Sequence, residues 1–364
     1  PHLAAPRTTQ YPHQTKEFTM HARTILKPLA AAGVGLFAIA ALAGCSVDTG
    51  QGGAAAGGGG ETKENGMGDD GVFKVAAFTA GYGTPGGKLT LDYFVEAGNE
   101  QENWEVTLDT SEFNYDEITT EIQNQISGGA DAILAGFPDP RQTAVIEQAA
   151  ADAGIPIFSI DGGVEPNDAY AVDVTFSQQQ MAEETVGALE EAVGGSLEGK
   201  DVMVIGHDPH IGIQTRSNIA LDLLEEKGAS IAGGDMKQVL NPGTGRTEAL
   251  TFVQDYLQAN PDGLDAVWVG WDDGALGAVK AINEAGRDDI FVTGVDALEE
   301  TTAEIKKDGP MYASMAQDWI GVVDQVIDIM NDYRDSATLP DENFIDLPAE
   351  LIDRSNVDTF EPTL

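Results

Sequence analysis

The strongest constraint on the fold is an alternation of short apolar segments with amphipathic ones, which begins at Val72. Apolar segments such as Ala266–Val269 have the length and composition of buried strands. Helix-like segments lie between them, and in one of these Ile118, Ile122 and Ile126 recur at four-residue spacing on one face. Short apolar strands between amphipathic helices are typical of parallel sheets covered on both faces. Two successive runs of this strand and helix alternation occur along the chain, so we predict an α/β protein with two doubly wound parallel-sheet lobes.

The N-terminal region has the pattern of a lipoprotein signal peptide. Met20 opens a basic segment with Arg23 and Lys27, and residues 28–41 then carry no charge. This apolar run is shorter than the roughly 20 residues that span a bilayer as a helix, but it fits the core of a signal peptide. The sequence Leu-Ala-Gly-Cys at residues 42–45 follows and resembles a bacterial lipobox, in which the cysteine thiol is acylated and becomes the new N-terminus.

Three segments are therefore expected before the folded part. Residues 1–19 contain no methionine, so we expect translation to start at Met20 and treat 1–19 as an upstream extension. Residues 20–44 form the predicted signal peptide. Residues 45–71 comprise the lipidated Cys45 and a Gly-rich stretch that reads as a flexible tether. The mature protein is then expected at the extracytoplasmic face of the cell membrane, held there by its lipid.

Charge limits the class of ligand. The chain has 19 basic and 61 acidic residues and a formal net charge of −42. The acids are interspersed with apolar positions, which is typical of the surface of a folded protein. Such a field repels nucleic acid and anionic lipid and makes an anionic ligand less favourable. Cys45 is the only cysteine, so the chain cannot form an internal disulfide.

One motif points to a nucleotide. Residues Gly81–Gly86 match the G-x-G-x-x-G pattern of dinucleotide-binding turns, after a predicted strand and before a predicted helix. However, Pro85 removes a backbone N–H donor from the turn, no second nucleotide signature follows, and an exported protein has no evident supply of NAD. We favour a flexible loop over a cleft. An exported oxidoreductase that uses this loop remains the less favoured alternative.

A second motif could suggest a metal. His207-Asp208-Pro209-His210 follows a predicted strand, but two histidines and one acid fall short of a closed zinc site, and the proline makes the segment a turn. We expect no metal and no cofactor, and consider His210 as a partner for a ligand hydroxyl instead. No signature of a catalytic triad or of a zinc protease is present, so we expect a binding protein and not an enzyme.

Five segments, in this order, resemble the ribose- and galactose-type periplasmic solute-binding proteins of ABC transporters. They are residues 127–134, 153–161, 266–278, 292–296 and 313–317. The third, AVWVGWDDGALGA, is the most specific. The resemblance extends from Val72 to about Asp353 and implies the type I fold, in which two lobes are joined by a hinge that the chain crosses three times.

The resemblance also implies the extent of the lobes. The N-terminal lobe would contain residues 72–173 and 318–343, and the C-terminal lobe residues 174–317 and 344–364. The crossings would then lie near Asp173–Val174, Gln317–Asp318 and Phe344–Leu347.

Several ligand contacts follow from the same resemblance. Asp161 matches an aspartate that accepts hydrogen bonds from sugar hydroxyls, and Arg216 matches an arginine that donates to them. Asp272 matches the aspartate of the second lobe, and Gln317 a glutamine at a hinge crossing. Thr251 falls where the family commonly has an asparagine.

Two positions depart from the family pattern. The family often has an arginine after the first aspartate, where this chain has Gly162, and Phe137 replaces a frequently polar residue. The missing arginine, together with the aromatic content, favours a small pentose or polyol.

Elementary chemistry supports such a site. Carboxylates accept hydrogen bonds from hydroxyls, and guanidinium and amide groups donate to them. The C–H faces of sugars pack on flat apolar walls, for which Trp271, Trp319 and Tyr82 are candidates. Other interpretations stay open at this point. Asp272 could cap a helix, Arg216 could form a surface ion pair and Trp319 could pack against its own helix, whereas Trp268 is expected in the core.

We therefore expect a lipid-anchored, monomeric receptor that captures a neutral sugar or sugar alcohol and delivers it to an ABC permease in the membrane. Binding of nucleic acid is not expected. The alternative is a chemosensory receptor of the same fold that reads a sugar-like autoinducer. The exported oxidoreductase is less favoured.

Overall fold

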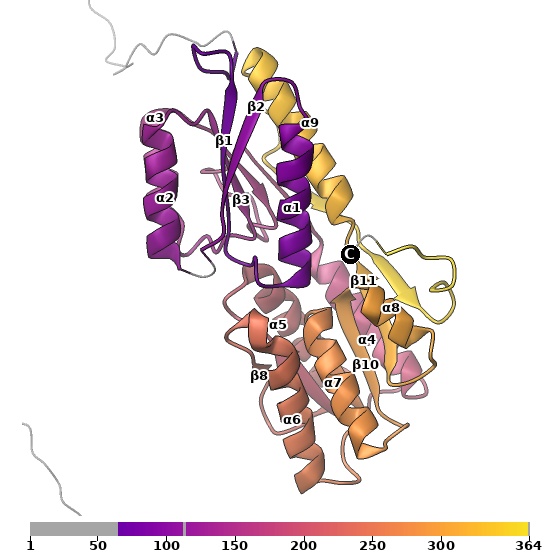
Figure 1. Ribbon diagram of the computed structural model, residues 1–364. Coiled ribbons are helices and arrows are strands. Elements are labelled where there is room, and N and C mark those ends of the chain that lie inside the picture. The colour runs from indigo at the N-terminus through magenta and orange to yellow at the C-terminus, as the bar shows by residue number, and fades with distance from the viewer. Residues whose placement is uncertain (1–64, 112–113, 363–364) are drawn as a thin grey trace, which may run out of the picture. The chain divides into compact units, whose positions relative to one another are not determined.

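Figure 1 shows the computed structural model, which describes residues 65–111 and 114–362. In this part of the chain, none of the helices combines the length and the apolarity that crossing a membrane requires. The predicted upstream segment 1–19, signal peptide 20–44 and lipidated Cys45 lie outside the described residues, as does most of the tether.

The first sheet is built from six strands in the described residues. These strands are β1 (Phe73–Thr79), β2 (Trp104–Asp109), β3 (Ala132–Gly136), β4 (Ile157–Ile160), β5 (Val172–Phe176) and β12 (Phe344–Leu347). Their spatial order is β2-β1-β3-β4-β5-β12, and every pair is parallel. This is a doubly wound order in which the direction of winding reverses between β1 and β3.

Helices cover both faces of this sheet, which explains why β3, β4 and β5 are buried along their whole length. One face carries α1 (Pro85–Asn99) and α9 (Trp319–Ser336), and the other carries α2 (Tyr115–Ser127) and α3 (Ala144–Ala153) (Figure 1). The apolar stripe predicted on α2 faces the sheet, where Ile118 and Ile122 are fully buried.

The second sheet repeats the plan. Its strands are β6 (Asp201–Gly206), β7 (Ser230–Ile231), β8 (Lys237–Gln238), β9 (Ala266–Val269), β10 (Phe291–Asp296), β11 (Met311–Ala316) and β13 (Glu350–Asp353). The order is β7-β6-β9-β10-β11-β13, with β8 paired to β6 and only β13 antiparallel among these described strands. The prediction of two doubly wound sheets is confirmed.

Helices also cover both faces of the second sheet. One face carries α4 (Gln178–Ala192) and α5 (Ile211–Glu226). The other carries α6 (Gly245–Ala259), which a short 3₁₀ turn at Pro242–Thr244 precedes, α7 (Asp272–Ala285) and α8 (Glu299–Ile305). As predicted, Trp268 is a core residue. It is fully buried in β9, and its Nε1 donates to the Thr185 hydroxyl of α4 at 2.8 Å.

Strand pairing corrects two of the three predicted crossings. The first does not fall at Asp173–Val174, because β5 continues in the first sheet to Phe176. The third does not fall at Phe344–Leu347, because this segment is β12 and pairs with β5. The chain passes to β13 of the second sheet only after Leu347. The predicted crossing at Gln317–Asp318 agrees with the change from β11 to α9.

Close packing of α6 on α7 depends on Gly277. A Cβ atom at this position would lie 2.1 Å from the Arg246 carbonyl oxygen, which belongs to the backbone and cannot move aside cheaply. This contact matters for function, because α7 starts directly after Trp271 and α6 starts at Gly245, against which the Trp271 ring packs.

We predict that Gly277→Ala lowers the free energy of unfolding by about 1–3 kcal/mol or more through overpacking. Gly187→Ala is the matched control, since Gly187 is an exposed helical glycine at which an added Cβ atom would have no other atom within 4 Å. It should stabilise the protein by about 0.5–1 kcal/mol. Guanidinium denaturation measures both, and equal effects of the two substitutions would contradict this role of Gly277.

Candidate functional site

A pocket lies where the carboxyl ends of the strands of both sheets meet. Ligand sites of doubly wound sheets lie in this position, next to the point where winding reverses. The loops after β1, β3 and β4 contribute from the first sheet, and the end of β10 and the loops after β6, β9 and β11 contribute from the second. The lining residues are Gly81, Thr84, Pro85, Gly86, Gly87, Phe137, Asp161, His207, His210, Ile213, Arg216, Trp271, Asp273, Asp296, Gln317 and Trp319.

Seven of the ten predicted ligand residues line this pocket. They are Phe137, Asp161, His210, Arg216, Trp271, Gln317 and Trp319. They come from segments that are far apart in the sequence, and the fold brings them together at one place. Their roles toward a ligand remain a prediction.

Three lining residues have backbone conformations that side chains rarely adopt. Phe137 (φ 52°) and Asp161 (φ 54°) directly follow β3 and β4, and Asp296 (φ 129°) ends β10. Non-glycine residues with positive φ cost of order 1–3 kcal/mol and cluster at functional sites, where the surrounding structure holds them. Strain at three strand ends around one pocket makes these positions candidates for a functional role.

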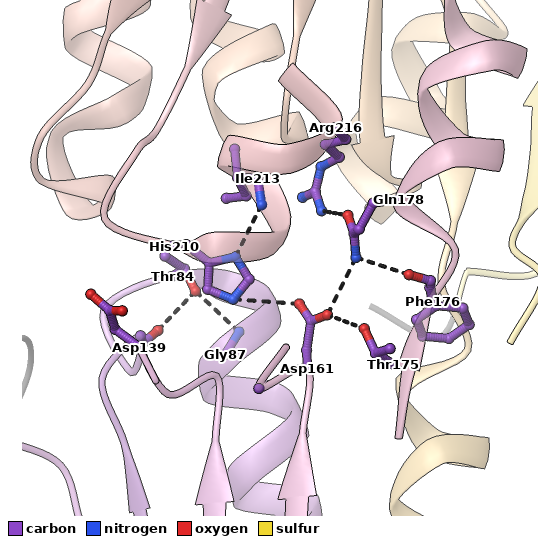
Figure 2. Close-up of polar contacts among 12 residues, drawn as sticks. Thr84, Gly87, Asp139, Asp161, Thr175, Phe176, Gln178, His210, Ile213 and Arg216 are labelled. Atoms are coloured by element: carbon purple, nitrogen blue, oxygen red, sulfur yellow. Dashed lines mark hydrogen bonds and ion pairs between the residues drawn. The ribbon is translucent and has the colours of Figure 1, made fainter. Parts of the chain in front are cut away.

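Asp161 lies at the centre of the polar network in Figure 2. The Thr175 hydroxyl donates to its Oδ1, and Nε2 of His210 lies 3.4 Å from its Oδ2. Nδ1 of His210 accepts from the Ile213 backbone N–H at 3.2 Å and so caps α5. Because Nδ1 accepts, the proton of the neutral ring is on Nε2 and faces the carboxylate. Burial lowers the pKa of His210 to about 4, so the ring is uncharged at neutral pH.

Arg216 supplies the cation of the pocket. It is 3 % exposed, its Nε donates to the Gly270 carbonyl at 2.8 Å, and its Nη1 donates to Oε1 of Gln178 at 2.8 Å. Burial lowers the pKa of Arg216, but a guanidinium remains charged in proteins. These bonds leave Nη2 to face a ligand. The surface ion pair considered from the sequence is therefore wrong for Arg216.

Aromatic rings form one wall. Trp319, the first residue of α9, is 3 % exposed and packs edge-on against Phe137 and Phe176, each with ring centroids 5.0 Å apart. Trp271 is 5 % exposed on the second-sheet side. A sugar ring or polyol chain could lay its C–H face on such surfaces.

Gln317 and Trp271 are lining side chains whose buried polar atoms have no hydrogen-bond partner among the described residues. Both amide atoms of Gln317, Oε1 and Nε2, are unpaired, as is Nε1 of Trp271. A buried polar group that lacks a partner costs about 1–3 kcal/mol. The pocket thus offers two donors and one acceptor that a hydroxyl-bearing ligand would satisfy.

Asp272 was predicted as a ligand residue but does not line the pocket, whereas Asp296, which was not predicted, does. Asp272 is fully buried and does not line the pocket, because its carboxylate accepts from the Ser314 hydroxyl at 2.7 Å and the Leu298 N–H at 3.0 Å. Asp296 lines the pocket instead and accepts from the Asp272 N–H at 3.2 Å. Burial raises the pKa of Asp272 to about 6, and burial and the neighbouring Asp272 raise that of Asp296.

Tyr82 and Thr251 were also predicted as ligand residues and do not line the pocket. The Tyr82 hydroxyl donates to Asp92 on the outer side of α1, and the ring does not line the pocket. Thr251 is exposed on α6, where its hydroxyl donates to the Thr247 carbonyl within the same helix. Asp273 and His207 line the pocket but were not predicted as ligand residues. Asp273 is next to Asp272, and His207 belongs to the histidine motif. Both follow a predicted strand, and this position in the sequence was the signal that could have identified them.

An arginine at position 162, as in the family pattern, would crowd its neighbours unless they moved. A Cβ atom there would lie 2.1 Å from the Ser159 hydroxyl oxygen. Its N–H instead donates at 3.0 Å to Asp173, a carboxyl buried in β5. The presence of glycine in place of arginine at position 162 therefore goes with the close packing of Ser159 and Asp173 next to Asp161.

The glycine-rich loop lines the pocket, as the interpretation of residues 81–86 as a loop over a cleft predicts. Its helix terminus is poorly equipped for phosphate. Pro85 at the first helical position has no N–H, and the Gly87 N–H already donates to the Thr84 hydroxyl. Across the described residues, His, Cys, Asp and Glu side chains form no group of three or more placed to hold a metal ion.

Asp173 makes stability depend on pH. Burial raises its pKa to about 7, so the folded state favours the protonated form. Its contribution to stability is full below the unfolded pKa of about 4 and is lost as the pH rises through about 7. We predict that wild type loses up to about 4 kcal/mol more unfolding free energy than Asp173→Asn between pH 4 and pH 8. Parallel pH profiles from urea denaturation would contradict this.

Comparison with solved structures agrees with this architecture. The fold is similar to that of an ABC transporter solute-binding protein from Agrobacterium vitis with bound allitol, with a TM-score of 0.70, 21 % identity and coverage of 79 % of this chain and 97 % of that one. It is also similar to a Mycobacterium smegmatis solute-binding protein with bound glycerol, with a TM-score of 0.69, 23 % identity and coverage of 79 % and 96 %. At these identities the likeness establishes the fold.

Similar sequences point the same way. The putative rhizopine-binding protein of Rhizobium meliloti is 26 % identical over 72 % of this chain and 86 % of its own length. The ribose import binding protein of Bacillus subtilis is 24 % identical over 63 % and 71 %. The family model of the periplasmic binding protein domain matches residues 82–337, which is more than half of the chain. The chain therefore belongs to the periplasmic binding protein family.

Proposed function

We propose that this protein is an extracytoplasmic receptor that captures a neutral sugar or sugar alcohol and delivers it to an ABC permease. The observation that carries the proposal is the unpaired, buried amide of Gln317 in a pocket that both sheets line. An amide that both donates and accepts is suited to a hydroxyl, which does the same. Relatives named as ribose and D-apiose import binding proteins and as a xylitol-binding protein support this ligand class.

The charges of the pocket favour a neutral ligand. Asp161, Asp273, Asp296 and Arg216 line it, and His210 is uncharged. An anionic ligand would meet three carboxyl groups near one guanidinium. A neutral polyol can donate to the carboxylates and accept from Nη2 of Arg216 and Nε1 of Trp271. A ligand without these hydroxyls would leave the buried polar groups unpaired, which is a strong basis for rejection.

The pocket also suggests how binding is signalled. Asp161 follows β4 of the first sheet. Arg216 lies on α5, which covers the second sheet, and Asp296 ends β10 of that sheet. A ligand that bonds to all three stabilises the arrangement in which the sheets approach each other, by its difference in affinity for the closed and open forms. The permease would recognise that closed form.

We further propose that Cys45 carries a lipid that anchors the mature protein to the membrane. The basic segment, the apolar run and the small residues before Cys45 support this. Expressed in a bacterial host, the wild type should partition with membranes, and Cys45→Ser should lose this lipid-dependent association. The proposal would be contradicted if the wild type and Cys45→Ser appeared in the same fraction and mass spectrometry found no acyl group on the wild type.

A thermal-shift and calorimetry screen tests the ligand class. The panel contains D-ribose, xylitol, allitol, myo-inositol, glycerol, an amino acid, a nucleotide and a sugar phosphate. A ligand at about 100 times its Kd stabilises the folded state by about 2.7 kcal/mol. We expect shifts with neutral polyhydroxy compounds only. A shift with the nucleotide or the sugar phosphate alone would contradict the proposal.

The variant Gln317→Leu tests the residue that carries the argument. It should weaken binding of the best panel compound by about 10- to 100-fold, which corresponds to loss of hydrogen bonds to a buried amide. The ligand-free protein should be no less stable, because the amide has no partner to lose. Thr251→Ala is the control and should leave the affinity unchanged. Retained affinity in Gln317→Leu would exclude the amide from binding.

A further inference from the structure

Gln178 occupies the first crossing between the two sheets but does not line the pocket. It is the first residue of α4, directly after the Ser177 cap and two residues after β5 ends. It is 5 % exposed, although a glutamine at the first turn of a helix is usually solvated. Because a buried amide needs hydrogen-bond partners, the bonds of Gln178 at this crossing show which groups it holds in place.

The Gln178 amide bonds in two directions, as Figure 2 shows. Its Nε2 donates to the Phe176 carbonyl at 2.9 Å and reaches Oδ1 of Asp161 at 3.5 Å. Its Oε1 accepts from Nη1 of Arg216 at 2.8 Å. One neutral group therefore connects the carboxylate of the first sheet with the guanidinium of the second.

This connection replaces a direct ion pair. Asp161 and Arg216 attract each other across the pocket, but the described residues contain no salt bridge between them. A direct pair would turn both groups away from a ligand. With an amide between them, each keeps its charge and free hydrogen-bonding positions for hydroxyls.

The surroundings accommodate this amide closely. A Cβ atom at Gly212 would lie 3.2 Å from Nε2 of Gln178 and 3.1 Å from Cε1 of His210. A glycine at the start of α5 thus leaves space for Gln178 beside His210. An amide satisfies both sides at neutral pH, whereas a carboxylate cannot donate to Asp161 or Phe176 and an aliphatic chain can bond to neither side.

We propose that Gln178 is a positioning residue that holds Asp161 and Arg216 in the geometry required for ligand binding before the ligand arrives. The inference rests on the proposed function, since it concerns affinity for a polyol. Preorganisation of this kind increases affinity by reducing the ordering that binding must impose.

Gln178→Met tests the bridge, with Gln179→Met as the matched control. Gln179 is the next residue, is exposed and bonds only to Glu183 on the same helix. We expect Gln178→Met to weaken binding of D-ribose, xylitol, allitol or myo-inositol, whichever binds the wild type, by about 10- to 100-fold. Gln179→Met should change the affinity less than twofold. Equal affinities of wild type and Gln178→Met would overturn the proposal.

Gln178→Glu separates positioning from simple packing. Its carboxylate can accept from Arg216 but stands beside Asp161 with a like charge, and it faces His210 as well. When protonated, it matches the amide in shape and donates again. Its affinity relative to wild type at the same pH should therefore recover as the pH falls from about 8 to about 5. Gln178→Met should show no recovery. A constant ratio for Gln178→Glu would indicate a packing role only and contradict the proposal.

A ligand-free measurement keeps this inference separate from the proposed function. Spin labels at Gln123→Cys on α2 and Gln258→Cys on α6, both exposed positions, report the distance between the two sheets in a Cys45→Ser background. We expect Gln178→Met to broaden the distance distribution and Gln179→Met to leave it unchanged. If no panel compound binds the wild type, the proposed function fails. An unchanged distribution in Gln178→Met would overturn the bridge itself.

Discussion

The site depends on how the carboxylate of Asp161 is satisfied. A carboxylate this deeply buried is unfavourable unless hydrogen bonds replace its water. Its neighbours come from separate segments: Thr175 on the neighbouring strand and Gln178 at the hinge donate to it, and Nε2 of His210 at the start of α5 lies 3.4 Å away. The same network therefore fixes the first strand ends, the crossing and the second-sheet helix that carries Arg216. Strain at Asp161 is tolerated because these contacts hold it there.

The division between structural and ligand-facing acids follows the same principle. Asp272 uses its oxygens on Ser314 and Leu298, so it joins α7 to β11 and α8 and has little left for a ligand. Asp296 retains free acceptor positions, and both amide atoms of Gln317, the acceptor Oε1 and the donor Nε2, are unpaired. The pocket between the sheets thus holds unpaired polar atoms that a polyol can satisfy.

Sequence reasoning recovered the sheets because short apolar strands and helical stripes are local patterns. It also recovered Arg216 and Gln317, whose positions after strands are readable. It failed where a residue's role depends on distant partners. Asp272 follows a strand and Asp296 ends one, so the two look alike in the sequence. Only the packing shows that the Ser314 hydroxyl donates to Asp272 and not to Asp296. The segment 344–347 alternates weakly in burial, so its pairing with β5 could not be predicted from its own residues.

The most direct test is a crystal structure of the protein with the panel polyol that binds most tightly. We expect the ligand between the sheets, with hydroxyls bonded to the Gln317 amide and to Nε1 of Trp271, and with Asp161 and Arg216 on opposite sides of it. Electron density for the ligand elsewhere, or in this pocket with the Gln317 amide still unpaired, would contradict the proposed site.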